Sequence, residues 1–437
     1  MTAEREGCVD LLVHGGDVLT VDAAGTVVEN GAVAVRDGVI AAVGTAAELR
    51  ARFRADEEID AGCCLVLPGL INAHTHLAMN LLRGRADDVT LQEFLARVIP
   101  AEAELLSPRA VAAAVRVAAA ESIRAGVTTA LDMFWYHEAA EEALEPTGWR
   151  LLTGPTFMDV PDPPDRRDYR GRADWARACL TARRPVRPGT RPVVFAHSAY
   201  TLSPDQLTDI AGLARRHGAL LHLHAAENAA ETASVVAAHG RRPVELLASL
   251  GLLGPDVLLA HAVDLTDGEV AALARAGTAV VHCPVSNLKL GCGIAPVPEL
   301  LRRGVTVGLG TDGAVSSNTL DLLAAVRMAS LVHKSGGDPT RVPARQAVRM
   351  ATVESARALG LAHELGSLEQ GKRADLVVLD LDRPHLVPRH DPWSVLGYAA
   401  SAADVRDTVV DGRVLMRDRR LLTIDERAAL DELNALA

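Results

Sequence analysis

Residues 67–84 read LPGLINAHTHLAMNLLRG, an apolar run that breaks at Pro68-Gly69, resumes, and ends on His74-Thr75-His76. Residues two apart on a strand point to the same side of it. Both imidazoles can therefore reach one cation, and neutral imidazole is a common ligand of divalent metals such as zinc. Taken alone, the stretch has an alternative interpretation, in which the two histidines are simply polar residues at the end of a strand and bind no metal.

Downstream of this stretch, apolar runs alternate with Ala- and Leu-rich helical stretches, the pattern of βα units around a parallel sheet. Helix starts are marked by Ser107-Pro108, by Ser203-Pro204 and by the capping-box spacing of Thr266 and Glu269. Eight candidate strands begin near Leu65, Val127, Arg150, Val193, Leu220, Val257, Thr278 and Val305. The sequence predicts an α/β fold, a (β/α)8 TIM-like barrel over residues 65–363.

Strand patterns also stand at both ends of the chain. In residues 10–22 and 374–382, apolar residues alternate with polar ones or form continuous runs, as in strands. Asp37-Gly38 and Asp411-Gly412 suit two-residue hairpin turns with positive φ. The strands at either end are too few to bury a face alone. We therefore expect one small β-sandwich domain built from residues 1–64 and 364–437.

Unusual polar residues follow the expected barrel strands. A (β/α)8 barrel places its catalytic groups at the C-terminal ends of its strands. Scattered surface histidines would not coincide with strand ends in this way, so the pattern indicates a metal site. The residues are His74 and His76 after the first strand, His197 after the fourth, His222 and His224 after the fifth, His261 after the sixth, His282 after the seventh and Asp312 after the eighth.

In LLHLHAAE, residues 220–227, the two histidines share a face and only one needs to bind metal. We assign His224 as the ligand because it lies nearer the strand exit, and expect His222 one layer deeper. Glu227 lies three residues after His224. It is either a carboxylate that the dipole of the following helix favours or, because it lies beside the proposed metal ligand, a group that transfers protons.

Asp312, in VTVGLGTDG, is either a helix cap or a fourth ligand that accepts a proton from the attacking water. His261, in VLLAHAV, is either a hydrogen-bonded core histidine or a partner of that water. The chain's only lysines are Lys289, Lys334 and Lys372. None lies on the fourth strand, where a two-metal barrel hydrolase keeps a carbamylated lysine, so one metal is favoured.

Composition restricts the function classes. A net charge of −11 with dispersed arginines argues against nucleic acid, whereas 49% hydrophobic and 23% charged residues are ordinary for a globular enzyme. The N-terminus, MTAEREGCVD, carries charges where a signal peptide needs an apolar core, and no apolar run is long enough for a membrane span, so we expect a cytoplasmic protein that binds no membrane. We also expect a homo-oligomer. Six cysteines without a C-x-x-C pair indicate reduced thiols, and Cys283 is read as a buried residue rather than a ligand.

Seven ordered motifs resemble the amidohydrolase superfamily, and within it the deaminases of S-adenosylhomocysteine, methylthioadenosine and other 5'-modified adenosines. The likeness covers nearly the whole chain, including the β domain. The motifs are PGLINAHTHLAMNLLRG, AHSAYTLSP, LHLHAAEN, LLAHAVDL, VVHCPVSNLKLG, GLGTDGAVSSN and GSLEQGKRADLVVLD.

The resemblance implies that one divalent metal, Zn²⁺ or alternatively Fe²⁺, is bound by His74, His76, His224 and Asp312. It implies that Asp312 accepts a proton from the water that attacks the amine-bearing ring carbon. Glu227 would protonate the adjacent ring nitrogen, and His261 would stabilise the developing alkoxide, before ammonia leaves. Two carboxylates in different environments suit these acid and base roles.

Substrate contacts are implied at Glu102, which matches a ribose-binding carboxylate, and at His197 and Ser316. Each has a structural alternative: a solvated helix acid, a strand-end histidine and a helix cap.

Two departures from the family pattern put the 5' substituent in doubt. Phe94 stands where relatives often carry tryptophan, and LLTGPTFMD, residues 151–159, lacks an arginine that relatives can offer to an amino-acid tail. Residues 160–172 read as a surface loop whose arginines either compensate or are simply solvated; they are Arg166, Arg167, Arg170 and Arg172.

The leading hypothesis is a metal-dependent hydrolytic deaminase that converts adenosine or a 5'-modified adenosine to the inosine analogue and ammonia. One alternative keeps the scaffold but changes the ring, to cytosine, guanine or a pterin, or removes chloride from a triazine. A remote alternative is a non-catalytic scaffold protein on the same fold.

Overall fold

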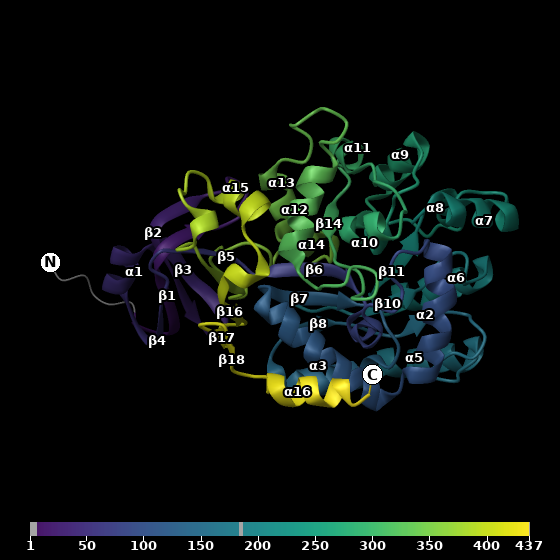
Figure 1. Cartoon of the computed structure of the whole chain (residues 1–437), viewed down its shortest axis with the longest axis horizontal. Helices are drawn as coiled ribbons and strands as arrows, with labels where there is room; N and C mark the ends of the chain where they lie inside the picture. Colours follow the sequence, from purple (N-terminus) through teal and green to yellow (C-terminus); the bar gives the residue numbers. More distant parts are fainter. Residues whose placement is uncertain (1–6, 183–186, 437) are drawn as a thin grey trace.

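A computed structural model describes residues 7–182 and 187–436. Figure 1 shows a β-rich domain at one end of the molecule and a larger α/β barrel at the other. No helix within the described residues is long and apolar enough to cross a membrane.

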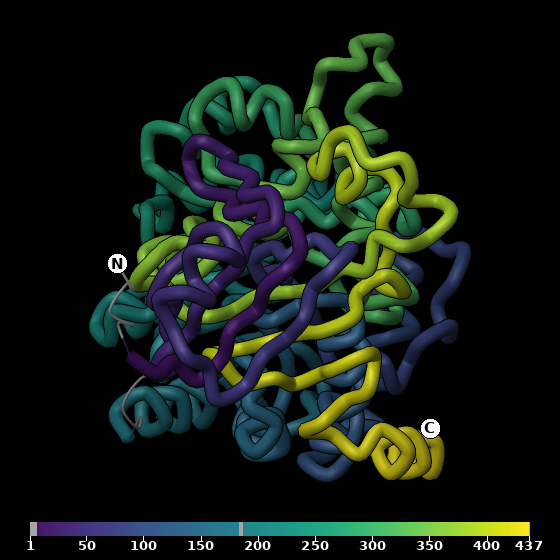
Figure 2. Tube along the Cα trace, turned by 90° about the vertical axis from the view of Figure 1, so that its left-hand side faces the viewer, coloured from purple at the N-terminus to yellow at the C-terminus, as the bar shows by residue number. Residues whose placement is uncertain are grey.

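Strands from both termini form one nine-stranded sheet in the order β18-β17-β16-β15-β5-β1-β2-β3, with β4 paired to β1. Figure 2 looks at this end of the molecule, where purple N-terminal and yellow C-terminal strands lie side by side. A β-rich domain made from both termini is therefore confirmed. The strands are β1 (Gly7–Leu19), β2 (Val27–Arg36), β3 (Val39–Thr45), β4 (Phe53–Asp60), β5 (Cys64–Pro68), β15 (Leu376–Asp380), β16 (Val405–Val410), β17 (Arg413–Arg417) and β18 (Arg420–Leu421).

The two hairpins turn where the sequence predicts. Asp37 and Gly38 join β2 to β3 with φ of 52° and 71°, and Asp411 and Gly412 join β16 to β17 with φ of 50° and 76°. Two consecutive left-handed residues give the turn whose twist matches that of the strands.

The barrel consists of a six-stranded sheet, β14-β13-β12-β11-β10-β9, and a three-stranded sheet, β6-β7-β8. The short strands β8 and β9 follow each other along the third barrel position, so nine labelled strands occupy eight positions. The barrel closes where the Asp312 N–H donates to the His74 carbonyl at 3.0 Å. The strands are β6 (Leu70–Thr75), β7 (Val127–Asp132), β8 (Arg150–Leu152), β9 (Thr156–Phe157), β10 (Val193–Ala196), β11 (Leu220–Ala225), β12 (Val257–His261), β13 (Ala279–His282) and β14 (Val307–Leu309).

The expected strand beginning near Leu65 is wrong as a barrel strand. β5 pairs with β1 and β15 in the terminal sheet, and the first barrel strand, β6, begins at Leu70. The chain changes sheets at Gly69, whose N–H donates to the Asp375 carbonyl. A Cβ there would collide with the Thr128 side chain, so this close approach requires glycine.

Helices cover the barrel, and their starts follow the capping signals. Ser107 caps α3, Ser203 caps α6, and Thr266 forms a capping box with Glu269 at α9. The α-helices are α1 (Ala46–Arg52), α2 (Leu91–Leu105), α3 (Pro108–Arg124), α4 (His137–Leu144), α5 (Tyr169–Thr181), α6 (Pro204–Arg216), α7 (Ala229–His239), α8 (Pro243–Ser249), α9 (Asp267–Ala276), α10 (Pro284–Lys289), α11 (Val297–Arg302), α12 (Leu322–Val332), α13 (Ala344–Met350), α14 (Val353–Ala358), α15 (Pro392–Ser394) and α16 (Glu426–Asn434). Short 3-10 or π turns are η1 (Leu77–Leu82), η2 (Glu145–Thr147), η3 (Pro384–Leu386), η4 (Val395–Ala399) and η5 (Ala402–Asp404).

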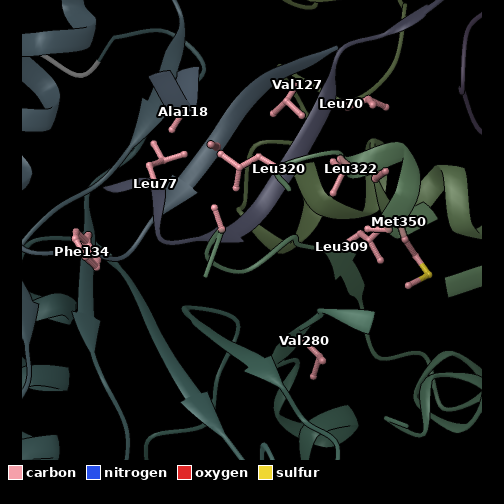
Figure 3. Close-up of a cluster of buried hydrophobic side chains, with 14 of the residues drawn as sticks. Leu70, Leu77, Ala118, Val127, Phe134, Val280, Leu309, Leu320, Leu322 and Met350 are labelled. Atoms are coloured by element: carbon pink, nitrogen blue, oxygen red, sulfur yellow. The ribbon is translucent and has the colours of Figure 1, made fainter. Parts of the chain in front are cut away.

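The main hydrophobic core joins barrel strands to the helices around them. Figure 3 shows part of it, with Leu70 of β6 near Val127 of β7, and Leu309 of β14 near Met350 of α13. Burial of such side chains contributes roughly 1.5–3 kcal/mol each. The core thus fixes the strands whose ends carry the polar residues of interest.

The interpretation of residues 160–172 as a surface loop is partly wrong. Asp168 caps α5, which begins at Tyr169, and Arg172 is only 2% exposed. The Arg172 guanidinium donates to Asp165 at 2.5 Å and to the Met158 carbonyl at 2.7 Å. These contacts replace the water that the buried charge has lost.

Candidate metal centre and active site

Five side chains from four barrel strands meet at the mouth of the barrel. His74 lies in β6 and His76 directly follows it, His224 lies in β11, His261 ends β12 and Asp312 follows β14. Two groups, His74 with His76 and His224, and His74 with His261 and Asp312, each bring their possible ligand atoms within 4.8 Å of one another. His74 belongs to both, so all five surround one point.

The backbone is strained where the strands end. His261 has a φ of 71° and Asp312 a φ of 63°, in the left-handed region that L-residues seldom adopt. Such conformations persist where the surrounding structure holds them, and they cluster at functional sites.

Hydrogen bonds fix which nitrogen of each histidine faces the centre. The Nδ1 of His76 lies 2.5 Å from the Met133 carbonyl, and the Nδ1 of His224 lies 2.9 Å from the His197 carbonyl. Because a carbonyl only accepts, each Nδ1 carries the hydrogen. The two Nε2 atoms are then unprotonated, and they face each other at 3.3 Å.

His74 is oriented through His222. The Nδ1 of His222 donates to the Leu258 carbonyl at 3.0 Å, so its Nε2 accepts from the Nδ1 of His74 at 2.8 Å. This leaves the Nε2 of His74 unprotonated, buried, and without a hydrogen-bond partner among the described residues. Burial lowers the pKa of His74 to about 4, which keeps the ring neutral. Three convergent lone pairs of this kind suit a divalent cation.

Asp312 completes the ring of donors. Its Oδ1 lies 3.3 Å from the Nε2 of His76 and 3.5 Å from the Nε2 of His74. Its Oδ2 accepts from the hydroxyls of Ser286, at 2.6 Å, and Ser316, at 2.7 Å. Burial works against ionisation of Asp312 because it raises the pKa, whereas the two hydroxyl donors favour the ionised form. The carboxylate is thus held in the form that binds a metal.

Glu227 and His261 lie beside these donors. The Nε2 of His261 is 3.7 Å from the Glu227 carboxylate, and its Nδ1 is 2.8 Å from the Asn287 amide oxygen, which makes Nδ1 the donor. Burial raises the pKa of Glu227 to about 7. Burial lowers the pKa of His261, but Glu227 and Asp312 raise it above its ordinary value. A carboxyl that titrates near neutrality can both take up and release a proton.

A pocket opens from this centre, and it contains all four of the expected substrate contacts, Phe94, Glu102, His197 and Ser316. Glu102 is not a solvated helix acid, since it is 4% exposed. Its carboxylate accepts from the Trp135 indole at 3.2 Å, and burial raises its pKa to about 8. The Ser316 hydroxyl is already used, since it donates to Asp312.

Two of the other residues near strand ends, His282 and Cys283, lie apart from the centre, whereas His197 adjoins it. His282 pairs with His333, their Nε2 atoms being 3.3 Å apart. Cys283 is buried within a hydrophobic cluster and belongs to neither group of possible ligands at the barrel mouth. His197 packs against His224 with ring centroids 4.8 Å apart.

Sequence reasoning missed several residues of the site. Ser286 and Asn287 follow the seventh strand in VVHCPVSN, so their position could have identified them. Trp135 and Met158 line the pocket but carry no local signal, because helix α2 and α5 bring their partners from elsewhere in the chain. Arg172 stacks over Trp135, with its guanidinium 4.7 Å from the ring.

Comparisons with known proteins agree with this architecture. A family model described as "Amidohydrolase family" matches residues 65–415, and one for an imidazolonepropionase-like composite domain of bacteria matches residues 31–55. The chain is 45% identical over 432 residues to a 5-methylthioadenosine/S-adenosylhomocysteine deaminase of Syntrophobacter fumaroxidans, covering 98% of both chains. It is 40% identical over 433 residues to a 5'-deoxyadenosine deaminase of Methanosarcina acetivorans, again covering 98% of both.

Among solved structures, it is similar to an adenosine deaminase from Xanthomonas campestris with bound zinc. The TM-score is 0.93 at 35% identity, over 99% of this chain and 98% of that one.

Proposed function

This chain belongs to the amidohydrolase family, and on that premise we propose that it is a metal-dependent deaminase that hydrolyses an adenosine-like nucleoside to its inosine analogue and ammonia. The observation that carries the proposal is the meeting of three unprotonated imidazole nitrogens with a carboxylate at one end of a pocket, with a buried carboxylate at Glu102 further along it. Full-length relatives named as deaminases of modified adenosines support the substrate class.

In this proposal, His74, His76, His224 and Asp312 hold one divalent cation. The nitrogen-rich set favours Zn²⁺, with Fe²⁺ as the alternative. A cation held there would make water a stronger acid and a better nucleophile near neutral pH. His222 takes no place among the ligands because its Nε2 is occupied by His74.

The chain's own residues then move the protons. Asp312 accepts a proton from the water that attacks the amine-bearing ring carbon. Glu227, with a pKa near neutrality, donates a proton to the adjacent ring nitrogen, and the imidazole of His261 stabilises the negative charge that grows on the new oxygen. The remaining proton of the attacking water passes from the new oxygen back to Glu227, which restores its protonated form. The carbon–nitrogen bond breaks, and the amine leaves as ammonia with the proton that Asp312 had accepted.

The far end of the pocket supports a small apolar group at the 5' position. Among the described residues that line the pocket, none is a lysine or arginine, and helix α2 contributes Phe94, Leu95, Val98 and Ile99 beside Glu102. Arg172 faces Trp135 and is bonded to Asp165 and Met158, so it cannot meet a carboxylate there. An amino-acid tail would have to desolvate two charges without partners, which is costly. We propose methylthioadenosine or 5'-deoxyadenosine ahead of S-adenosylhomocysteine.

The test is ammonia release by the zinc-loaded protein across a matched panel: adenosine, 5'-deoxyadenosine, methylthioadenosine, S-adenosylhomocysteine, free adenine, guanine and cytosine, and a chlorotriazine whose chloride release is followed. We expect kcat/KM to be highest for the two nucleosides with apolar 5' groups. Turnover of free bases or the triazine without turnover of any nucleoside would overturn the nucleoside proposal. S-adenosylhomocysteine as the best substrate would overturn only the apolar 5' preference. No turnover of any compound, together with no zinc retained after loading, would favour the scaffold alternative.

A further inference from the structure

A second group of metal-binding side chains lies outside the barrel mouth, between helices α4 and α5. His137 begins α4 and Glu138 follows it, while Cys179 lies in the last turn of α5. The Nδ1 of His137 is 3.4 Å from the Oε2 of Glu138, and the thiol of Cys179 is 3.7 Å from the Oε1 of the same carboxylate. One atom from each side chain lies within 4.8 Å of the others.

Packing holds these three side chains in place. Trp175, one turn before Cys179, donates its indole N–H to the Oε1 of Glu138 at 2.8 Å, and its ring lies 5.1 Å from that of His137. The guanidinium of Arg167 covers the same indole at 4.5 Å. His137 is buried, whereas Glu138 is half-exposed and Cys179 partly exposed. The group is therefore ordered by its surroundings and still open to solvent on one side.

We propose that His137, Glu138 and Cys179 form a second site for a thiophilic divalent cation such as Zn²⁺, distinct from the catalytic centre. Zinc bonds of about 2.0–2.3 Å to nitrogen, oxygen and sulfur in a tetrahedron place ligand atoms roughly 3.3–3.7 Å apart. The distance from His137 to Oε2 of Glu138 and the distance from Cys179 to Oε1 lie in this range, and one ligand atom from each of the three residues lies within 4.8 Å of the others. Small side-chain shifts would bring all three atoms to the spacing that zinc requires. Three protein ligands leave a fourth position for water, which makes the cation exchangeable.

The charges around Cys179 are consistent with such a site. Burial and the Glu138 carboxylate raise the pKa of the thiol to about 11, and Arg167 opposes this only in part. The thiol is therefore protonated in the free protein, and a cation would be needed to hold the thiolate beside Glu138. Binding should release a proton and become tighter as pH rises.

A cation bound at this second site would also affect the wall of the substrate pocket. The residues just before α4, among them Trp135, line the pocket, and α5 carries the Arg172 that stacks over Trp135. A cation joining the start of α4 to the end of α5 would hold these two helices together. The site is thus placed to stabilise the substrate-binding wall without touching substrate.

Cobalt binding distinguishes this site from the catalytic one, because a thiolate-to-cobalt absorption band requires a cysteine ligand and none of the five side chains at the barrel mouth is a cysteine. The full-length protein, loaded first with one equivalent of zinc, is titrated with Co²⁺, and the near-ultraviolet thiolate-to-cobalt charge-transfer band is followed. We expect the band to saturate at about one cobalt per chain. Cys179→Ser should abolish it, and Glu138→Gln should weaken cobalt binding about tenfold or more. The matched control Cys63→Ser, at an exposed cysteine, should leave it unchanged.

A band that survives Cys179→Ser, or no band at all in the wild type, would overturn the proposal. A second measurement needs no variant: excess zinc should protect one thiol from alkylation, mapped by mass spectrometry to Cys179. Equal alkylation of Cys179 with and without zinc would also overturn it. Neither result bears on ammonia release, so failure here is distinguishable from failure of the proposed deaminase activity.

Discussion

Replacing Glu102 with glutamine should stabilise the protein and weaken its binding of substrate. Glu102 is 4% exposed, on α2, and one of its oxygens accepts from Trp135 while the other has no hydrogen-bond partner among the described residues. Burial raises its pKa from 4.5 to about 8. Glutamine keeps the shape and an oxygen for the Trp135 indole, but it carries no charge.

The size of the stability effect follows from the pKa. A carboxyl whose pKa rises on folding holds its proton in the native state after the unfolded chain has lost it, so the native state is destabilised as pH rises. The cost begins near pH 4.5 and is complete above about pH 8. At about 1.4 kcal/mol per pH unit it reaches about 5 kcal/mol, which glutamine removes. The difference between variant and wild type should therefore grow with pH across this window and be small at pH 5.

Substrate binding should show the opposite effect. Ribose hydroxyls donate to the ionised carboxylate, so the KM of the wild type should fall as pH rises towards 8 and then level. A hydrogen bond to a charged group contributes roughly 1.5–3 kcal/mol, so Glu102→Gln should raise KM about 10- to 100-fold and remove its pH dependence through this group.

Denaturation of the metal-loaded proteins from pH 5 to 8.5, with ammonia release over the same range, measures both effects. Glu104→Gln, an exposed position on the same helix, is the matched control and should change neither. A stability difference that does not vary with pH, or an unaltered KM, would refute the reasoning.

Two further predictions concern the proposed roles at the barrel mouth. Glu227→Gln should retain the metal by elemental analysis but lower kcat about 10²- to 10⁴-fold, because an amide cannot transfer the proton; near-normal turnover would remove Glu227 from the mechanism. His224→Asn should lose the metal, whereas His222→Asn should bind it about 10- to 100-fold more weakly through misorientation of His74. If His222→Asn strips the metal and His224→Asn does not, the assignment within this pair is reversed.

Much of the fold could be predicted because its signals are local. N-cap residues before proline and Asp-Gly turns act within a few residues, and the starts of α3, α6 and both hairpins agree with them. The first barrel strand begins later than predicted, because the residues on both sides of Pro68-Gly69 are apolar and the sequence does not show that they enter different sheets. Only the pairing of β5 with β15, some three hundred residues away, shows that Pro68-Gly69 divides two sheets.

The candidate site also has one part that could be predicted from the sequence and one part that could not. Its metal-binding end could be predicted, because parallel strands bring their C-terminal residues to one mouth and period-two spacing selects the inward face. The pocket wall could not. Buried Glu102 contacts Trp135, and Trp135 is covered by Arg172, which sequence composition placed in a surface loop. Charged residues are usually exposed unless paired, and the pairing of Arg172 with Asp165 was not visible in the sequence.

The pair in LLHLHAAE illustrates why spacing alone could not decide between two histidines. Both side chains point into the barrel, and the difference between them is depth. The register pairs His222 with Leu258 and His224 with Ala260, one step nearer the mouth. At the deeper level the imidazole meets the Leu258 carbonyl and His74, so one ring nitrogen donates and the other accepts. His222 therefore fixes the tautomer of His74, and both histidines of the motif serve the same cation, His224 as a proposed ligand and His222 by orienting one.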